Sequence, residues 1–449
     1  MSSVRTLEIL IALFGIYFMS GSLTTPLTPA GSDASFGVQA IGALLGLGAI
    51  LTLAATPGAI NRVIVLYWPV LLLPALAVLS LVWSVDPALS FRRAGSLILT
   101  TFFGFWLVER FQPSIILRLF IWASIFVILT STYAIFYVPK SGIHQLYDIE
   151  GAQHAGSWRG LFYHKNDFGR AIALSASTLL IAVFFNSKLR WIALPLFAFC
   201  ALLVLRSNSS QGLMVYISVP SALVALVVLM KLRPIGRGML LIFMIPLLLA
   251  VYMSSRIIFE SILFFLGKEA TLTGRTDIWA GVLLALQEDM MFGGGFGAGW
   301  EVVGVRLFAL TGIDVGHAHN GYLDLATDLG MFGLFLTIGF LFWMAYLCLA
   351  ALMRRRLRGI ALLGLAVFIF TIAGNWVGSF LLTHNSLYWL TPVVVFCLMR
   401  QVFNPYGRSA RADEATAALP SPGEIPVFPQ RPSANSDAGG DTGARPNES

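Results

Sequence analysis

The sequence predicts an all-α protein that crosses a lipid bilayer about twelve times. Hydrophobic residues make up 57% of the 449 residues, charged residues only 11%, and the mean hydropathy is +0.81. Soluble globular proteins carry about 25% charged residues, so this composition excludes an ordinary soluble domain. Long apolar runs, separated by short polar loops, recur along most of the chain.

Twelve apolar runs approach the length of a membrane span, since a helix needs roughly 20 residues to cross the hydrocarbon core. The first run is short and could instead be the apolar part of a signal peptide. A few polar residues join the last two runs, which predicts a tight hairpin. The expected spans are residues 6–22, 36–55, 63–83, 93–109, 115–138, 168–185, 189–205, 212–230, 239–260, 330–352, 360–381 and 385–401.

The basic residues predict which side each loop faces, because Lys and Arg collect in cytoplasmic loops. A cytoplasmic N-terminus puts most loop cations inside: Arg62, Arg110, Lys188, Arg190, Lys231, Arg233, Arg237, Arg354, Arg355, Arg356, Arg358 and Arg400. The same alternation predicts a membrane domain over residues 1–403, with a large loop at about 256–329 outside. Residues 404–449 lack the apolar surface for a core, which predicts a disordered cytoplasmic tail.

Charge and cysteine content exclude two further classes. The net charge of +7 follows from the loop cations, so we expect no nucleic acid partner. All three cysteines lie in apolar runs, where cysteine acts as a small hydrophobe. We therefore expect no disulfide and no cysteine metal site. His317 and His319 with Asp314 could ligate a cation, but two histidines in a loop are weak evidence, so no metal is expected.

Several cations fall on the predicted outer face, against the charge rule. Snorkelling or pairing with a nearby acid explains any one of them. Together they suggest a clamp for phosphate or diphosphate, because the planar guanidinium matches that anion. The segment from Trp158 to Asp167 adds aromatic and amide groups of the kind that bind sugar phosphates. The candidate binding residues are Arg92, Arg93, Arg159, Lys165, Asn166, Arg206 and Arg275.

The expected outer loop contains two recognisable elements. Apolar residues recur at helical spacing over residues 276–291, which predicts an amphipathic helix. Arg275 stands at its beginning, where a helix N-terminus attracts anions. Five glycines between residues 293 and 299 predict a flexible turn that lets backbone approach a ligand. This run lacks the ending and the preceding strand of a phosphate-binding loop.

The sequence His317-Ala318-His319-Asn320 precedes a helical pattern. Asn320 is the expected N-cap, and Gly330 is expected to end the short helix before the next span. His319 would therefore be held rigidly at the outer face. Histidine suits proton transfer near neutral pH, which makes His319 a candidate general base. A purely structural histidine pair is the alternative.

Four sequence pieces together resemble the superfamily of O-antigen ligases and O-antigen or exopolysaccharide polymerases, over roughly residues 70–400. Two of the four are similar to its exopolysaccharide-production branch. The pieces are Trp83-Ser84-Val85-Asp86-Pro87 with Phe91-Arg92-Arg93, Gly160 to Asn166, Gly274-Arg275 with Trp279 and the glycine turn, and His319 to Leu323 with Asp328-Leu329-Gly330.

The chain departs from the family's pattern at two places. The family often has Ser-Arg-Gly after the seventh span. Here residues 207–211 are Ser-Asn-Ser-Ser-Gln, with Arg206 one step earlier. Whether Arg206 does the work of the family's arginine is left open. The second departure is milder, since Asp328 stands where the family usually has Glu.

The resemblance implies a glycosyltransferase C-like helical fold in the bacterial inner membrane, with both termini cytoplasmic and the active loop periplasmic. It implies transfer from a polyprenyl-diphosphate-linked glycan, without cofactor. Arg275 would bind the leaving diphosphate, with Arg206 and Arg92 or Arg93 as helpers. His319 would take the acceptor's proton. The second choices for that base are His317 and His164, and Asn320 is a further substrate-binding candidate.

Three functions remain open. Polymerisation of exopolysaccharide or O-antigen units is favoured by the exopolysaccharide-like pieces. A ligase would use the same donor with lipid A-core, or a protein, as acceptor. A lipid-linked oligosaccharide transporter is disfavoured, because the central parts of the spans are almost free of charge. The expected partners are donor, acceptor and membrane lipids, with a flippase or chain-length regulator as a further candidate.

Overall fold

The computed structural model describes residues 3–28, 35–148, 151–185, 188–232, 275–287 and 290–404. Its contacts divide the chain into one unit from Met1 to Asn404 and another from Pro405 to Ser449. The expected tail after Asn404 lies outside the described residues. So do the expected span at 239–260 and the part of the expected outer loop before Arg275.

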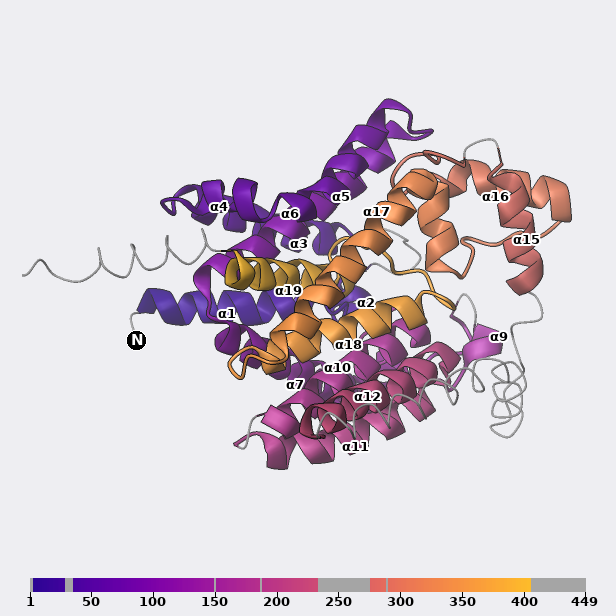
Figure 1. The fold of residues 1–449 in the computed structure, drawn as a ribbon. Helices are drawn as coiled ribbons and strands as arrows, with labels where there is room; N and C mark the ends of the chain where they lie inside the picture. Colours follow the sequence, from indigo (N-terminus) through magenta and orange to yellow (C-terminus); the bar gives the residue numbers. More distant parts are fainter. Residues whose placement is uncertain are drawn as a thin grey trace, which may run out of the picture. The chain divides into compact units, whose positions relative to one another are not determined.

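The regular elements are all helices, so the predicted all-α class is confirmed for the part of the chain that the structure describes (Figure 1). The longer helices are α1 (Ser3–Phe18), α3 (Phe36–Ala54), α4 (Ala59–Leu66), α5 (Trp68–Leu79), α6 (Pro87–Arg110), α7 (Pro113–Tyr137), α10 (Lys165–Phe185), α11 (Arg190–Arg206), α12 (Ser210–Lys231), α15 (Arg275–Ala285), α16 (Trp300–Thr311), α17 (Gly321–Ala351), α18 (Arg358–Gly374) and α19 (Leu387–Phe403). Short helical turns are α2 (Thr24–Leu27), η1 (Ser80–Val82), α8 (Pro139–Gly142) and α9 (Gly151–His154).

Within the described ranges, five helices are long and apolar enough to cross a membrane: α3, α7, α10, α12 and α17. The pair α4 and α5 would make a sixth span, bent by 82° at its break. The helices α18 and α19 are apolar but only 17 residues long. The chain is thus a multi-pass membrane protein. The count of twelve spans stays a prediction.

Helix α10 lies at the centre of one half of the bundle, packed against α7, α11, α12 and α18. Figure 1 shows α10, α11 and α12 side by side. Gly169 of α10 meets Gly212 of α12 so closely that a Cβ on either would touch the other's backbone. Small residues allow this approach, which is how helices pack where lipid provides no hydrophobic drive. The approach brings the beginnings of α10 and α12 together.

Helix α6 is central to the other half, between α3, α5 and α19. Asp86 caps its beginning by accepting a hydrogen bond from the Leu89 N–H at 3.0 Å. At its far end the buried carboxylate of Glu109 accepts from Arg62 Nε at 2.8 Å and from the Tyr67 hydroxyl at 2.6 Å. Buried charge at that end is therefore paired, as a low-dielectric interior requires.

The expected hairpin between the last two spans is wrong. Helix α18 ends at Gly374, and residues 375–386 form a loop before α19. The Asn375 side chain donates to Thr371 O and accepts from the Phe380 N–H at 2.9 Å. Its backbone carbonyl accepts from Gly321 N, also at 2.9 Å. The loop is apolar enough to resemble a span, but these bonds hold it in a non-helical path.

Helix α17 breaks at Gly330, where φ is 65° and ψ is −173°, as the sequence predicted. The glycine turn docks on this break. The N–H groups of Gly294 and Gly295 donate to the carbonyls of Thr327 at 2.8 Å and Asp328 at 2.9 Å. The turn over residues 293–299 is thus fixed by backbone bonds on both sides, rather than free to flex towards a ligand.

Replacing Gly330 by alanine should destabilise the fold strongly. A left-handed backbone costs a non-glycine residue about 1–3 kcal/mol, and the added Cβ would collide with the Met291 carbonyl. We expect a clearly lower melting temperature for the purified protein in detergent. Gly339→Ala in the same helix is the control, because a Cβ there meets nothing within 4 Å. Equal melting of both variants would contradict the packing described.

Candidate functional site

A cavity of about 310 Å³ lies at one end of the bundle, where α6, α17, the glycine turn and the 375–386 loop meet. Its lining contains one arginine, two histidines and two aspartates. Its walls combine charged groups with backbone and aromatic surface, as ligand sites commonly do. The lining residues are Arg93, Phe296, Gly297, Trp300, Gly316, His317, Gly321, Asp324, Leu325, Thr327, Asp328, Ser379, Phe380, Leu381, Leu382, Thr383 and His384.

Arg93 and His384 are electrostatic neighbours in this lining. The Arg93 guanidinium donates to the Gly297 carbonyl of the glycine turn. Burial, reinforced by the Arg93 charge, lowers the pKa of His384 to about 4, so this imidazole is neutral at pH 7. The carboxyl of Asp328 accepts from the Gly299 N–H at 3.2 Å, which ties α17 to the turn from the inside.

Asp324 positions the histidine loop. One of its carboxylate oxygens accepts from the Ala318 N–H at 2.8 Å, between the two histidines, and the other accepts from the Ser379 hydroxyl. Asn320 caps α17 as predicted, accepting from Tyr322 N at 3.0 Å and Leu323 N at 3.3 Å. The residue between these two anchors is His319, whose φ is 50°. A left-handed non-glycine residue is uncommon and is often found at functional sites.

The two histidines of the loop lie together, with ring centroids 4.0 Å apart. His317 lines the cavity, whereas His319 stands beside it and is not part of the lining. Desolvation lowers the pKa of His317, and the charges of Arg170 and Arg275 act in the same direction. Asp324 acts against them. At neutral pH this imidazole is therefore uncharged and able to accept a proton.

Arg275 is the first residue of α15, as the sequence predicted. The helix is shorter than predicted, because it ends at Ala285 rather than near residue 291. The Arg275 guanidinium donates to the Val377 carbonyl at 3.0 Å, and burial lowers its pKa. In the same helix Trp279 Nε1 donates to the Ala318 carbonyl at 3.0 Å. The helix thus holds the histidine loop at the same residue that Asp324 binds. It packs on α16 and α17 around Val282 and Leu307.

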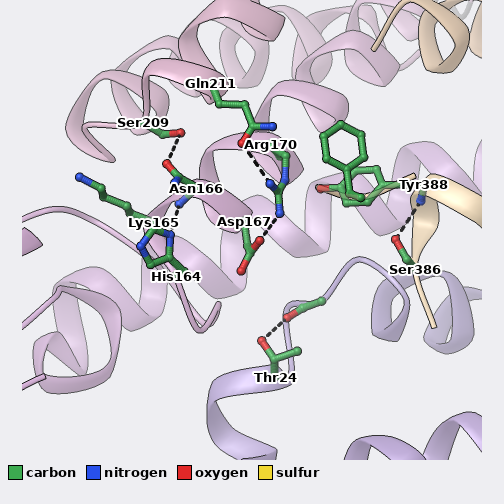
Figure 2. A network of polar contacts seen from close by, with 12 residues as sticks. Thr24, His164, Lys165, Asn166, Asp167, Arg170, Ser209, Gln211, Ser386 and Tyr388 are labelled. Atoms are coloured by element: carbon green, nitrogen blue, oxygen red, sulfur yellow. Dashed lines mark hydrogen bonds and ion pairs between the residues drawn. The ribbon is translucent and has the colours of Figure 1, made fainter. Parts of the chain in front are cut away.

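Arg170 is a second guanidinium of this region, and it comes from α10. Figure 2 shows it between Gln211 of α12 and Asp167 of its own helix. It donates to Gln211 Oε1 at 3.0 Å and forms an ion pair with Asp167. Its guanidinium also lies 4.9 Å from the centre of the Phe380 ring, which lines the cavity.

The remaining predicted binding residues lie away from the lining of this cavity. Arg159 pairs with Asp148 at 3.1 Å. The Arg206 guanidinium lies over the Trp158 ring at 5.2 Å. Lys165 and Asn166 open α10, where the Asn166 amide oxygen accepts from the Ser209 hydroxyl (Figure 2). The last of them, Arg92, is exposed on α6 beside Arg93.

Three histidines, His144, His154 and His164, form a separate cluster with ring centroids 5.1–5.8 Å apart. Burial and the neighbouring Arg159 lower the pKa of His144 to about 4. Its Nε2 accepts the Lys165 N–H at 3.1 Å. Across the described ranges, no group of three or more His, Cys, Asp or Glu side chains is arranged to hold a metal ion.

Sequence reasoning missed Arg170, Asp324, Ser379 and His384. Two of them were hidden inside apolar patterns, since Arg170 lies in the first turns of α10 and Asp324 in those of α17. An ionisable residue within an apolar span is a functional signal that could have identified both. Ser379 and His384 were assigned to a helix end and a short hairpin, so nothing in the pattern placed them at a cavity.

The fold and site define a helical membrane protein with a cavity at one end of its bundle, lined by Arg93 and His317 among others. A family model described as O-antigen ligase matches residues 172–338, which include α12, α15, α16, the histidine loop and the first half of α17. The match confirms the resemblance drawn from the motifs and assigns this region to the O-antigen ligase and polymerase superfamily. No curated protein matches the chain.

Replacing Asp324 by asparagine should lower the pKa of His317 further, because a carboxylate that favours the imidazolium is removed. Histidine-selective NMR titration of the purified protein measures this directly. We expect wild-type His317 to titrate below 6.5 and the variant lower still. Glu301→Gln, which removes an exposed carboxylate on α16, is the control. A rise of the pKa in Asp324→Asn would refute the described electrostatics.

Proposed function

We propose that this protein transfers a glycan from a polyprenyl diphosphate carrier to a sugar hydroxyl at the periplasmic face of the bacterial inner membrane. The observation that carries the proposal is a cavity whose lining contains both the Arg93 guanidinium and the His317 imidazole, with Arg275 bound to the Val377 carbonyl of the adjoining 375–386 loop. Guanidiniums suit a departing diphosphate, and a neutral imidazole suits an incoming hydroxyl. The O-antigen ligase family match supports the same class of reaction.

In the proposed reaction the acceptor oxygen attacks the anomeric carbon of the donor sugar. The bond from that carbon to the diphosphate oxygen breaks, and its electron pair leaves with the diphosphate. Arg275 stabilises the charge that develops there. His319 takes the hydroxyl proton, and the cavity-lining His317 orients the acceptor. The backbone of His319 is left-handed and anchored on both sides, which supports this assignment. A fixed backbone keeps the base at a constant distance from the acceptor hydroxyl, and proton transfer depends on that distance.

The acceptor decides between two versions of the activity. We favour polymerisation of repeat units, on the exopolysaccharide-like sequence pieces. The family match is described as O-antigen ligase, which favours transfer of a finished chain to lipid A-core as the second candidate. Donor and chemistry are the same in both.

His319→Ala should reduce transfer by about 10²–10⁴-fold, the usual contribution of a general base. We expect His317→Ala to lose less, because it removes an orienting group only. Transfer is measured with purified protein, lipid-linked donor and acceptor, at equal amounts of folded enzyme. The reverse ranking of the two variants would move the proton acceptor to His317, and wild-type rates in both would remove the histidine loop from the mechanism.

Arg275→Lys should not restore the activity lost in Arg275→Ala, because lysine keeps the charge but loses the planar fork. The readout is the rate of transfer at saturating acceptor. Arg306→Lys is a matched control, since Arg306 also donates to a backbone carbonyl, that of Ala285 at 3.2 Å, and does not line the cavity. Full activity of Arg275→Lys would show that charge alone suffices at this position.

Deletion of the gene separates the candidate functions in the cell. For a polymerase we expect single repeat units on the lipid carrier and no long polymer on gels of surface glycan. Long chains that stay on the carrier and never reach lipid A-core would identify a ligase. Repeat units trapped on the cytoplasmic side would identify a transporter and remove the catalytic proposal for His319.

A further inference from the structure

Arg170 is buried to an extent that arginine rarely tolerates without a purpose. Only 11% of its side chain is exposed, on a helix whose neighbouring positions are apolar. Removing a guanidinium from water costs free energy, and this cost is offset only where paired charges and hydrogen bonds replace the lost water. The described residues provide only part of this compensation, so the Arg170 guanidinium has hydrogen-bonding capacity left for a ligand.

The contacts of Arg170 leave part of its hydrogen-bonding capacity open. One terminal nitrogen donates to Gln211 Oε1 at 3.0 Å and the other meets the Asp167 carboxylate (Figure 2). Its Nε is buried and has no hydrogen-bond partner among the described residues. The guanidinium plane lies near two rings, 4.9 Å from Phe380 and 5.9 Å from Tyr388. The Tyr388 side chain also hydrogen-bonds the guanidinium, and the two rings help to hold it in place.

Asp167 is the more exposed partner of the ion pair. Its side chain is 42% exposed, whereas that of Arg170 is almost buried. An exposed carboxylate is released into water at low cost, while a buried guanidinium cannot follow it. A carboxylate also presents two oxygens much as a phosphate does, so it can occupy a phosphate position on the guanidinium fork.

Arg170 lies next to the cavity and its charge acts on a residue of the lining, His317. Its guanidinium faces Phe380, a lining residue. Arg275 of α15 donates to the Val377 carbonyl in the same 375–386 loop, so cations from two helices contact this loop, and both charges act on His317. Two guanidiniums bind a diphosphate more tightly than a single guanidinium does. Each can donate a pair of parallel N–H groups to the oxygens of a different phosphate.

We propose that Arg170 is the second diphosphate-binding residue of the site, and that Asp167 occupies its fork until the donor arrives. The incoming diphosphate displaces the Asp167 carboxylate and pairs with the guanidinium, while Gln211 keeps the side chain in position. This inference rests on the proposed function and specifies which residues hold its donor. Arg206, whose guanidinium lies over the Trp158 ring, is the alternative second arginine.

The test is binding of farnesyl diphosphate, a short prenyl diphosphate, to the purified full-length protein in detergent. Arg170→Gln should weaken binding by about tenfold to a hundredfold, the value of a charged hydrogen-bonding group. Asp167→Asn should tighten it several-fold, because the competing carboxylate is gone. Arg118→Gln, a cation on α7 that donates to Ser114 O, should bind like the wild type.

The opposite signs expected for Arg170 and Asp167 distinguish ligand binding from a structural ion pair. A purely structural pair would weaken binding equally from either side, and that result would overturn the inference. So would unchanged binding in Arg170→Gln, or a loss in Arg206→Gln that exceeds it. If Arg170→Gln fails to fold by circular dichroism, Arg170→Lys and Asp167→Asn carry the comparison, with Arg170→Lys expected to bind more weakly than wild type.

The wild-type result separates this inference from the proposed function. Wild-type protein that binds farnesyl diphosphate independently of Arg170 overturns the inference and leaves the proposed function standing. Folded wild-type protein that binds no diphosphate, even at millimolar concentration, overturns both. Farnesol serves as the probe without phosphate, and equal affinity for farnesol would show that the prenyl chain alone is recognised, which also contradicts the role of Arg170.

Discussion

The carboxylate of Asp324 joins the three segments on which the site depends. It lies in the first turn of α17, accepts the Ala318 N–H of the histidine loop, and accepts the Ser379 hydroxyl of the loop before α19. Loss of a buried acceptor leaves its donors unsatisfied, at a cost of about 1–3 kcal/mol for each. The Asp324 side chain therefore joins the histidines, the 375–386 loop and the broken helix into one structural unit.

Further hydrogen bonds from neighbouring segments hold this unit in place. Trp279 of α15 donates to the Ala318 carbonyl, and the carbonyl of Asn375 accepts from Gly321 N. The glycine turn pairs with the backbone just before Gly330. Backbone that leaves helical geometry has to find hydrogen-bond partners outside its own helix. The irregular segments of this protein are thus gathered where they satisfy one another, and the cavity lies among them.

The two ends of the bundle differ in how completely their buried charges are paired. At one end Glu109 is fully paired with Arg62, Tyr67 and Gln401, an arrangement that leaves nothing to bind a ligand. At the other end the buried Nε of Arg170 has no hydrogen-bond partner among the described residues. Incomplete pairing of buried cations is expensive in a folded protein, which makes it informative about where an anion binds.

Much of this was visible in the amino-acid sequence. Composition and hydropathy determine an all-helical membrane protein, since only helices satisfy their own backbone in lipid. The Asn320 cap and the Gly330 break follow from local preferences that need no tertiary contact. The histidine and glycine motifs with Arg275 also identified the superfamily. What the sequence could not show was proximity: Arg170 lies more than a hundred residues from His317, yet the two are electrostatic neighbours. The 375–386 loop has the composition of a span and becomes a cavity wall only because Asn375 and Asp324 hold it. The tertiary structure alone decided which ionisable groups meet, because packing of separate helices, rather than local preference, sets those distances.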